Sequence, residues 1–301
     1  MATPDQRKRF ISFALRYMVT FMAILEKVYL AFKSCSNEET RGEGAKDLDI
    51  AIAYYMGSLE GKDDGGSYDG SLIHMLANRM CVHFGTCSDE NNAVINERIM
   101  SLVYAGQGEL EMGVSISLYL YCDSFSSEAK TSDFLLPQAC TSMERTVNEI
   151  ENALIVPLIQ GVLFSARENE LHFKKKDYWE ANQRSSMPEF YPEGYALAQA
   201  ILPVITKVDQ SAATNIKNVM VVSFPTGFDD ANSNDSAKVH RAMKSAVSKM
   251  VGMDCSQIGS LGGVGFCAGD NEDSYDALNS ASGSPYSFAA LLIAGVLLVY
   301  I

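Results

Sequence analysis

Residues Met143–Phe173, MERTVNEIENALIVPLIQGVLFSARENELHF, carry a long and strongly apolar helical pattern. Their apolar side chains recur every three or four positions, which places them along one side of an α-helix. Pro157 lies inside this pattern and has no backbone N–H to donate, so we expect the helix to kink there or to divide into two.

The same spacing continues in both directions, over most of residues 8 to 250. The N-terminal stretch up to Ser34 predicts an amphipathic core helix, although Arg16 interrupts its apolar run and leaves no recognisable signal peptide. Further helices are predicted at Asp47–Leu59, Leu72–Phe84, Ala93–Tyr104 and Glu193–Val208, the last with Pro203 inside it.

Sustained strand alternation is scarce in this chain. Met112–Cys122 alternates for a few residues and Val219–Phe224 is long enough for a short strand, but neither has a hairpin partner. We therefore predict an all-α fold, a multi-helix domain with disulfide-stapled loops and a hydrophobic C-terminal tail.

Seven cysteines indicate disulfides and a location outside the cytoplasm. None forms a C-x-x-C motif, which argues against a zinc ribbon or a thioredoxin-like redox site. Cys81 and Cys87 enclose a short loop, and so do Cys255 and Cys267, so both pairs are plausible staples. The remaining three have no assigned partner: Cys35, Cys122 and Cys140.

The net charge of -13 argues against nucleic acid as a partner, because such a module needs a basic face. Catalysis is not expected either. There is no Gly-x-Ser-x-Gly nucleophile elbow, the four histidines have no catalytic spacing, and the glycines of 259–265 lack the Lys-Ser/Thr of a phosphate loop.

The last fifteen residues, 287–301, are SFAALLIAGVLLVYI and carry no charge. They are too short for an ordinary membrane-spanning helix, and small residues at 279–284 favour a GPI-anchor signal, with a short transmembrane tail as the alternative. We divide the chain into a helical domain (1–250), a Gly/Ser/Asp-rich disulfide loop and stalk (251–286) and this tail. The predicted location is the outer face of the plasma membrane.

Carboxylate and phenol groups concentrate where the predicted helix Asp47–Leu59 runs into the loop 61–70. Hard cations prefer oxygen ligands, and phenolate binds ferric iron strongly. A calcium loop is excluded, because the twelfth position counted from either Asp63 or Asp64 is not the glutamate that such a loop needs. The alternative to a metal site is an acidic turn with solvated aspartates and core tyrosines.

Two ordered blocks resemble a known family. The first contains AIAYYMGSLEG (51–61), GSLIHMLANR (70–79), Cys81, FGTC (84–87) and AVINERIM (93–100). The second contains VPLIQG (156–161) and EGYALAQAILP (193–203). Together they resemble the algal iron-assimilation (FEA) family, which includes the diatom phytotransferrins, over about residues 45 to 220.

The resemblance implies an α-helical cell-surface protein of algae that takes part in high-affinity iron acquisition, binding ferric iron (Fe3+) together with carbonate. Within the matching blocks, the oxygen donors expected to bind iron are Tyr55, Glu60, Glu193 and Tyr195. Three further donors are in reserve, Asp49, Asp64 and Tyr68, and Arg79 or Arg145 is the expected seat of the anion.

Two consequences and one alternative accompany this prediction. Acidification should release iron, because its oxygen ligands must be deprotonated to bind it. This acidification would follow internalisation of the complex by a surface or endocytic partner protein. The alternative is a structural or adhesive surface protein that binds a partner protein or a wall polymer and no metal.

Overall fold

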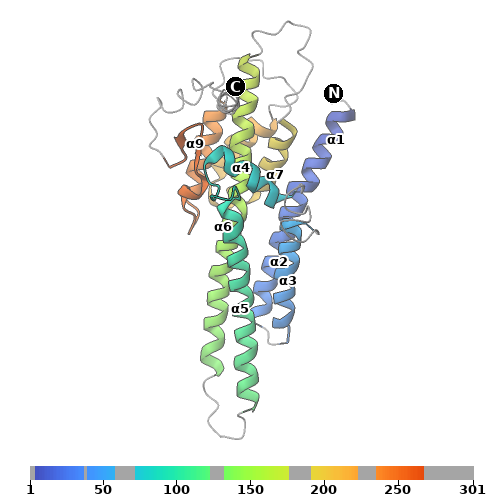
Figure 1. The fold of residues 1–301 in the computed structure, drawn as a ribbon, viewed down its shortest axis with the longest axis vertical. Helices are drawn as coiled ribbons and strands as arrows, with labels where there is room; N and C mark the ends of the chain where they lie inside the picture. Colours follow the sequence, from blue (N-terminus) through green and yellow to red (C-terminus); the bar gives the residue numbers. More distant parts are fainter. Residues whose placement is uncertain are drawn as a thin grey trace, which may run out of the picture.

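The computed structural model describes residues 4–36, 39–57, 72–122, 132–175, 191–222 and 235–267. They form α-helices and one two-stranded ribbon (Figure 1), which confirms the all-α prediction. The helices are α1 Pro4–Phe13, α2 Thr20–Cys35, α3 Arg41–Met56, α4 Ile73–Phe84, α5 Val94–Cys122, α6 Ser132–Lys175, α7 Tyr191–Val208, α8 Gln210–Lys217 and α9 Asp235–Val247. The hydrophobic C-terminal tail lies outside the described residues.

Shorter elements complete the order. Two π-helical turns, Ala14–Val19 and Asn218–Val222, follow α1 and α8, and a 3-10 turn spans Cys255–Ile258. Strands β1 (Ser260–Leu261) and β2 (Val264–Gly265) pair antiparallel. Met112–Cys122 is helical and belongs to α5, so its few alternating residues do not form a strand.

Of the two outcomes expected at the prolines, a kink or a division, the division is wrong, because α6 continues through Pro157 and α7 through Pro203. The residues on both sides of Pro157, Val156 and Leu158, are fully buried. Tertiary packing of this kind contributes more to the stability of a helix in a protein than the local propensity of one residue does.

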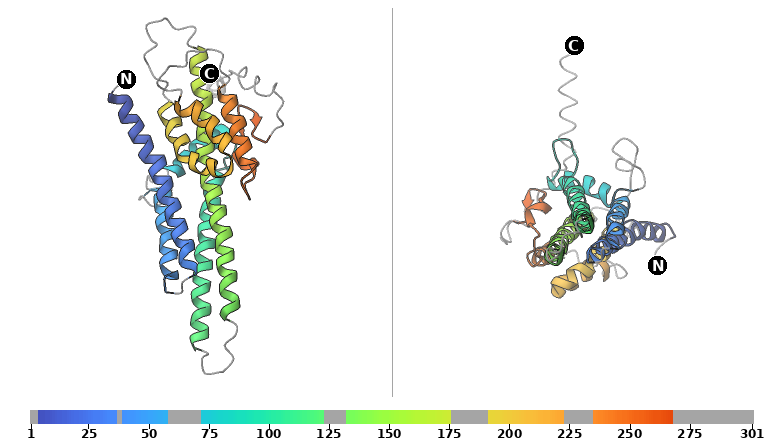
Figure 2. Two further views of the ribbon diagram at one scale, coloured as in Figure 1. Left: turned by 180° about the vertical axis from the view of Figure 1, so that it is seen from behind. Right: turned by 90° about the horizontal axis from the view of Figure 1, so that it is seen from below.

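The longest helices form an antiparallel hairpin around which the others gather (Figures 1 and 2). At 1.5 Å per residue, the 44 residues of α6 span about 66 Å and the 29 residues of α5 about 44 Å. Helices α2 and α3 pack side by side along part of this hairpin, while α4, α7, α8 and α9 surround its other half. Helix α6 contacts α2, α4, α5, α7 and α9.

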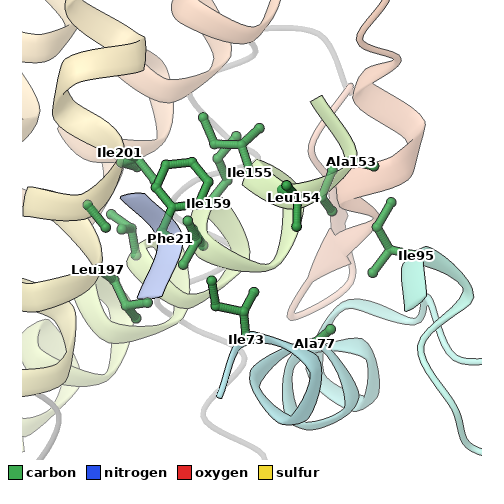
Figure 3. Packing of buried hydrophobic residues seen from close by; sticks show 14 of the residues in the cluster. Phe21, Ile73, Ala77, Ile95, Ala153, Leu154, Ile155, Ile159, Leu197 and Ile201 are labelled. Carbon is green, nitrogen blue, oxygen red and sulfur yellow. The ribbon is translucent and has the colours of Figure 1, made fainter. Parts of the chain in front are cut away.

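The centre of α6 is the centre of the core. Every residue from Ala153 to Leu163 is buried, and Figure 3 shows Ile155 and Ile159 among Phe21 of α2 and Leu197 of α7. The segment Cys140–Leu171 is long and apolar enough to cross a membrane, but 78% of its apolar window is buried inside the protein. Its apolar composition is therefore accounted for by the core.

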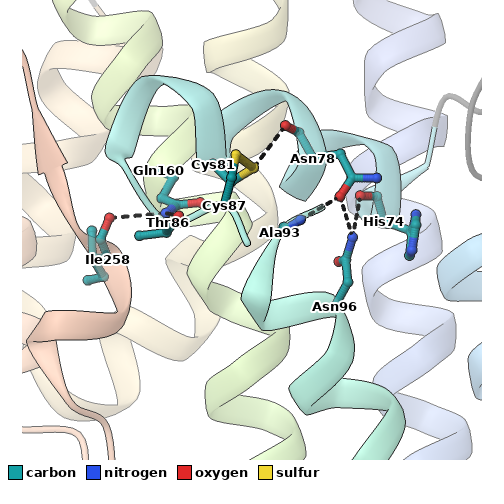
Figure 4. The surroundings of a disulfide bond; sticks show 9 residues. All are labelled: His74, Asn78, Cys81, Thr86, Cys87, Ala93, Asn96, Gln160 and Ile258. Carbon is teal, nitrogen blue, oxygen red and sulfur yellow. Dashed lines mark hydrogen bonds between the residues drawn. A yellow bond between two sulfur atoms is a disulfide. The ribbon is translucent and has the colours of Figure 1, made fainter. Parts of the chain in front are cut away.

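Three disulfides staple the described helices and loops. The two predicted pairs, Cys81–Cys87 (Figure 4) and Cys255–Cys267, are confirmed. A third, Cys35–Cys140, joins the end of α2 to α6. The loop closed by Cys255 and Cys267 packs into the core through three buried side chains, Ile258, Leu261 and Phe266.

We expect the Cys35–Cys140 bond to contribute most to stability, because it closes the longest of the three loops. The pair is 105 residues apart, so replacing both cysteines with alanine should lower the free energy of unfolding by about 4–5 kcal/mol. The matched change at Cys255 and Cys267, 12 residues apart, should cost about 3 kcal/mol. Urea unfolding of the oxidised proteins measures both values, and a smaller loss for the first pair would contradict the expectation.

Candidate functional site

Tyr55, at the last turn of α3, is fully buried. Its hydroxyl donates a hydrogen bond to Oδ1 of Asn96, and burial raises the pKa of its phenol well above the ordinary value. The amide of Asn96 in turn donates to the backbone oxygen of His74, at 3.2 Å, and to Oδ1 of Asn78, at 2.8 Å (Figure 4). Tyr55 therefore belongs to a network that links α3, α4 and α5.

Glu193 lies in the first turn of α7 and is only 5% exposed. Its Oε1 accepts a hydrogen bond from the hydroxyl of Tyr17, at 2.8 Å, and pairs with the guanidinium of Arg79. We call these three residues the Glu193 cluster. Its members come from the π-helical turn after α1, from α4 and from α7, so three separate elements meet at one carboxylate oxygen.

Burial and the neighbouring charges shift the pKa values of two members of the Glu193 cluster, Tyr17 and Arg79. Burial, and then the neighbouring Glu193 carboxylate, raise the pKa of Tyr17 well above the ordinary value of a phenol. Burial alone would lower the pKa of Arg79, but Glu193 outweighs it and the pKa is raised. At neutral pH the phenol of Tyr17 is therefore neutral and the guanidinium of Arg79 is charged, and both contact Glu193.

Close packing of α7 on α6 sets the position of Glu193. A Cβ atom on Gly194 would lie 2.6 Å from Cβ of Ser165, and one on Gly161 would lie 2.6 Å from Cδ1 of Leu197. Both distances are too short for real side chains, so these two glycines allow the close approach. The two sequence blocks, 51–100 and 156–203, also meet in space, because Arg79 of the first contacts Glu193 of the second.

Tyr195 has a different environment. Its half-buried ring packs edge-on against Phe10, with ring centroids 5.2 Å apart, and Gln199 donates to its hydroxyl at 3.4 Å. Tyr195 is two residues from Glu193, so the two side chains are about 200° apart around the axis of α7. Tyr195 is not among the described side chains that hydrogen-bond to Glu193.

The remaining predicted residues are placed as follows. Glu60, Asp64 and Tyr68 lie outside the described residues. Asp49 is exposed and accepts a hydrogen bond from Gln107 at 2.6 Å, and Arg145 is exposed on α6. The structure thus places Tyr55, Glu193 and Tyr195 in three separate environments, and their assignment as iron ligands stays a prediction.

Tyr17 is the member of the Glu193 cluster that sequence reasoning missed. Helical spacing assigns it to the core face of the N-terminal helix, which is correct, since it is 3% exposed. A buried tyrosine hydroxyl usually needs a hydrogen-bond partner, and that requirement was the available signal. The requirement for a partner does not identify Glu193, because Glu193 is 176 residues away in the chain.

One further group of metal-ligating residue types occurs in the described part of the chain, Asp254 with Cys255 and Cys267. The two sulfurs are bonded to each other, so they are not available as thiolate ligands. The carboxylate of Asp254 accepts hydrogen bonds from the backbone N–H and the hydroxyl of Ser256. This group is therefore explained by the fold of its loop.

Comparisons with known proteins give no assignment for this fold or site. No family model matches the chain, and no similar chain was found among curated proteins or solved structures.

The buried phenols predict a loss of stability in alkali. Because the pKa of Tyr17 is higher in the folded protein than in the unfolded chain, its contribution is complete below about pH 10 and declines above it, by about 1.4 kcal/mol per pH unit. Tyr17→Phe should make the pH dependence of the unfolding free energy shallower by that amount. Chemical denaturation between pH 8 and 11 measures the slope.

The control is Phe84→Leu, which removes packing from a buried position without removing a phenol. This variant should lower the free energy of unfolding equally at every pH. An unchanged slope for Tyr17→Phe would contradict the assignment of a neutral, hydrogen-bonded phenol to the Glu193 cluster.

Proposed function

We propose that this protein binds ferric iron at the surface of an algal cell, as part of high-affinity iron acquisition. The proposal combines the resemblance of two sequence blocks with one structural observation that carries it. Arg79 of the first block and Glu193 of the second meet in a single cluster, together with the phenol of Tyr17. The hydrophobic tail, as a GPI signal or a short transmembrane segment, would provide the membrane anchor.

The Glu193 cluster contains the types of group that such a site needs. Carboxylate and phenolate oxygens are ligands that ferric iron prefers, and a guanidinium is a suitable partner for a carbonate anion. Iron binding requires Tyr17 to lose its proton and Arg79 to turn from Glu193 to the anion. The Arg79 side chain is 44% exposed, so it has room for such a movement.

Proton competition gives the proposed site a release mechanism. The raised pKa of Tyr17 means that iron must displace a proton held by a buried phenol. Protons therefore compete with the metal, and the competition grows stronger as the pH falls. Acidification after uptake by a partner protein would empty the site.

Titration of the purified protein with ferric iron and bicarbonate tests this proposal. We expect saturable binding with a visible phenolate-to-iron charge-transfer band, lost in Tyr17→Phe and in Glu193→Gln and reversed on acidification. Tyr29 and Glu151 offer matched controls, because they form another tyrosine–glutamate hydrogen bond, at 2.6 Å, on an exposed surface. Tyr29→Phe and Glu151→Gln should leave the band unchanged.

The same titration distinguishes the ligands predicted from the sequence from those of the Glu193 cluster. Loss of the band in Tyr55→Phe or Tyr195→Phe, with Tyr17→Phe unaffected, would favour the ligands predicted from sequence over the Glu193 cluster. A protein that binds no ferric iron under any of these conditions would overturn the proposed function.

One observation favours a second function, that of a structural or adhesive surface protein without metal. Glu193 already pairs with Arg79 and Tyr17, so the cluster has a sufficient role in fixing α4, α7 and the N-terminal helix together. The long α5–α6 hairpin also extends well beyond the helices around it (Figure 1). On this account Glu193→Gln lowers stability and the purified protein contains no iron by elemental analysis.

A further inference from the structure

A cleft of about 660 Å³ opens between α9 and the segment formed by α8 and the π-helical turn after it. Helix α9 packs beside the upper part of α6 as drawn in Figure 2, and α8 packs against α7 and α9. None of the three residues of the Glu193 cluster lines the cleft. It is therefore a separate feature from the proposed iron site.

Small residues create the space inside the cleft. Ala212 of α8 and Ala242 of α9 both line it and are both buried. Because alanine side chains are short, the helices leave a hollow between longer side chains that remain exposed at its edges. Lys238 and Arg241 lie three residues apart on α9, so they project from one side of that helix into the same opening.

The lining is cationic in a chain whose net charge is -13. Lys238, Arg241 and Lys249 line the cleft, and the acidic residue among them is Asp209. Within the described part of the chain, Arg241 makes no ion pair. Clustered positive charge on a strongly acidic protein attracts anions locally against the overall field.

Asp209 lines the cleft, and its carboxylate is already hydrogen-bonded to groups of the protein. Its buried carboxylate accepts hydrogen bonds from Lys249, from the backbone N–H of Ala212 at 3.0 Å and from the hydroxyl of Ser245 at 2.7 Å. Together these hydrogen bonds hold the pKa of Asp209 well below its usual value, and the bond from Lys249 contributes most. Asp209 is thus an internal partner for Lys249 and does not pair with Arg241, which also lines the cleft.

We propose that this cleft binds a small organic polyanion that carries a phosphate or several carboxylates. The guanidinium of Arg241 forms paired hydrogen bonds with two oxygens of such a group, and the amide of Asn215 lines the facing wall. The volume lies in the range of small-molecule sites and is much larger than one phosphate ion needs. The ligand is therefore an anionic group on a larger molecule.

Calorimetric titration of the full chain without iron tests the proposal, with citrate, glucose 6-phosphate and inorganic phosphate as probes. We expect saturable binding of citrate or glucose 6-phosphate, at least tenfold tighter than binding of inorganic phosphate. Binding of citrate alone would identify carboxylates as the preferred group, and binding of the sugar phosphate alone would identify phosphate. Iron is absent, so the outcome is independent of the proposed iron site.

Two charge-reversal variants distinguish binding at the cleft from the effect of the protein's overall charge on binding. Arg241→Glu should weaken binding at least tenfold. Lys217→Glu makes the same charge change at an exposed position of α8 that does not line the cleft, and should change the affinity less than twofold. Equal losses in the two variants, or no saturable binding of any probe, would overturn the proposal.

Discussion

Burial of the central part of α6 determines how the other helices pack. Each fully buried Leu, Ile or Val side chain contributes about 1.5–3 kcal/mol relative to exposure. Every residue of α6 from Leu154 to Leu163 is buried, and most of them are Leu, Ile or Val. Five other helices pack against it. This packing keeps the helix continuous at Pro157, and it brings α7 so close to α6 that a side chain at position 194 would collide with Cβ of Ser165.

The position of Glu193 follows from that packing. Once α7 lies against α6, the carboxylate is removed from water, and a buried charge is strongly destabilising unless it is paired. Arg79 and Tyr17 provide the pairing from two other elements. The same contacts serve either function considered above: they hold the helices together, and they assemble a carboxylate, a phenol and a guanidinium at one point.

Local features of this protein were predictable from the sequence, and features between distant segments were not. Helical spacing gives α6 and α7, and the short separations of Cys81–Cys87 and Cys255–Cys267 indicate their pairing. Cys35–Cys140 has no such signal, because its partners are 105 residues apart. The hydrogen bond from Tyr17 to Glu193 likewise depends on how α7 packs. Tyr55 was predicted as a ligand because its phenol is an oxygen donor. The helical spacing gave no information on the hydrogen bond that its buried hydroxyl donates to Asn96.

The proposed iron site requires Glu193 to bind ferric iron directly. X-ray absorption at the iron edge, on protein loaded with one equivalent of ferric iron and bicarbonate, tests it most directly. We expect a single iron surrounded by oxygen and nitrogen atoms, with a spectrum that changes in Glu193→Gln and is unchanged in Glu151→Gln. A spectrum with iron–iron scattering, typical of hydrolysed ferric hydroxide, or one identical in both variants would contradict it.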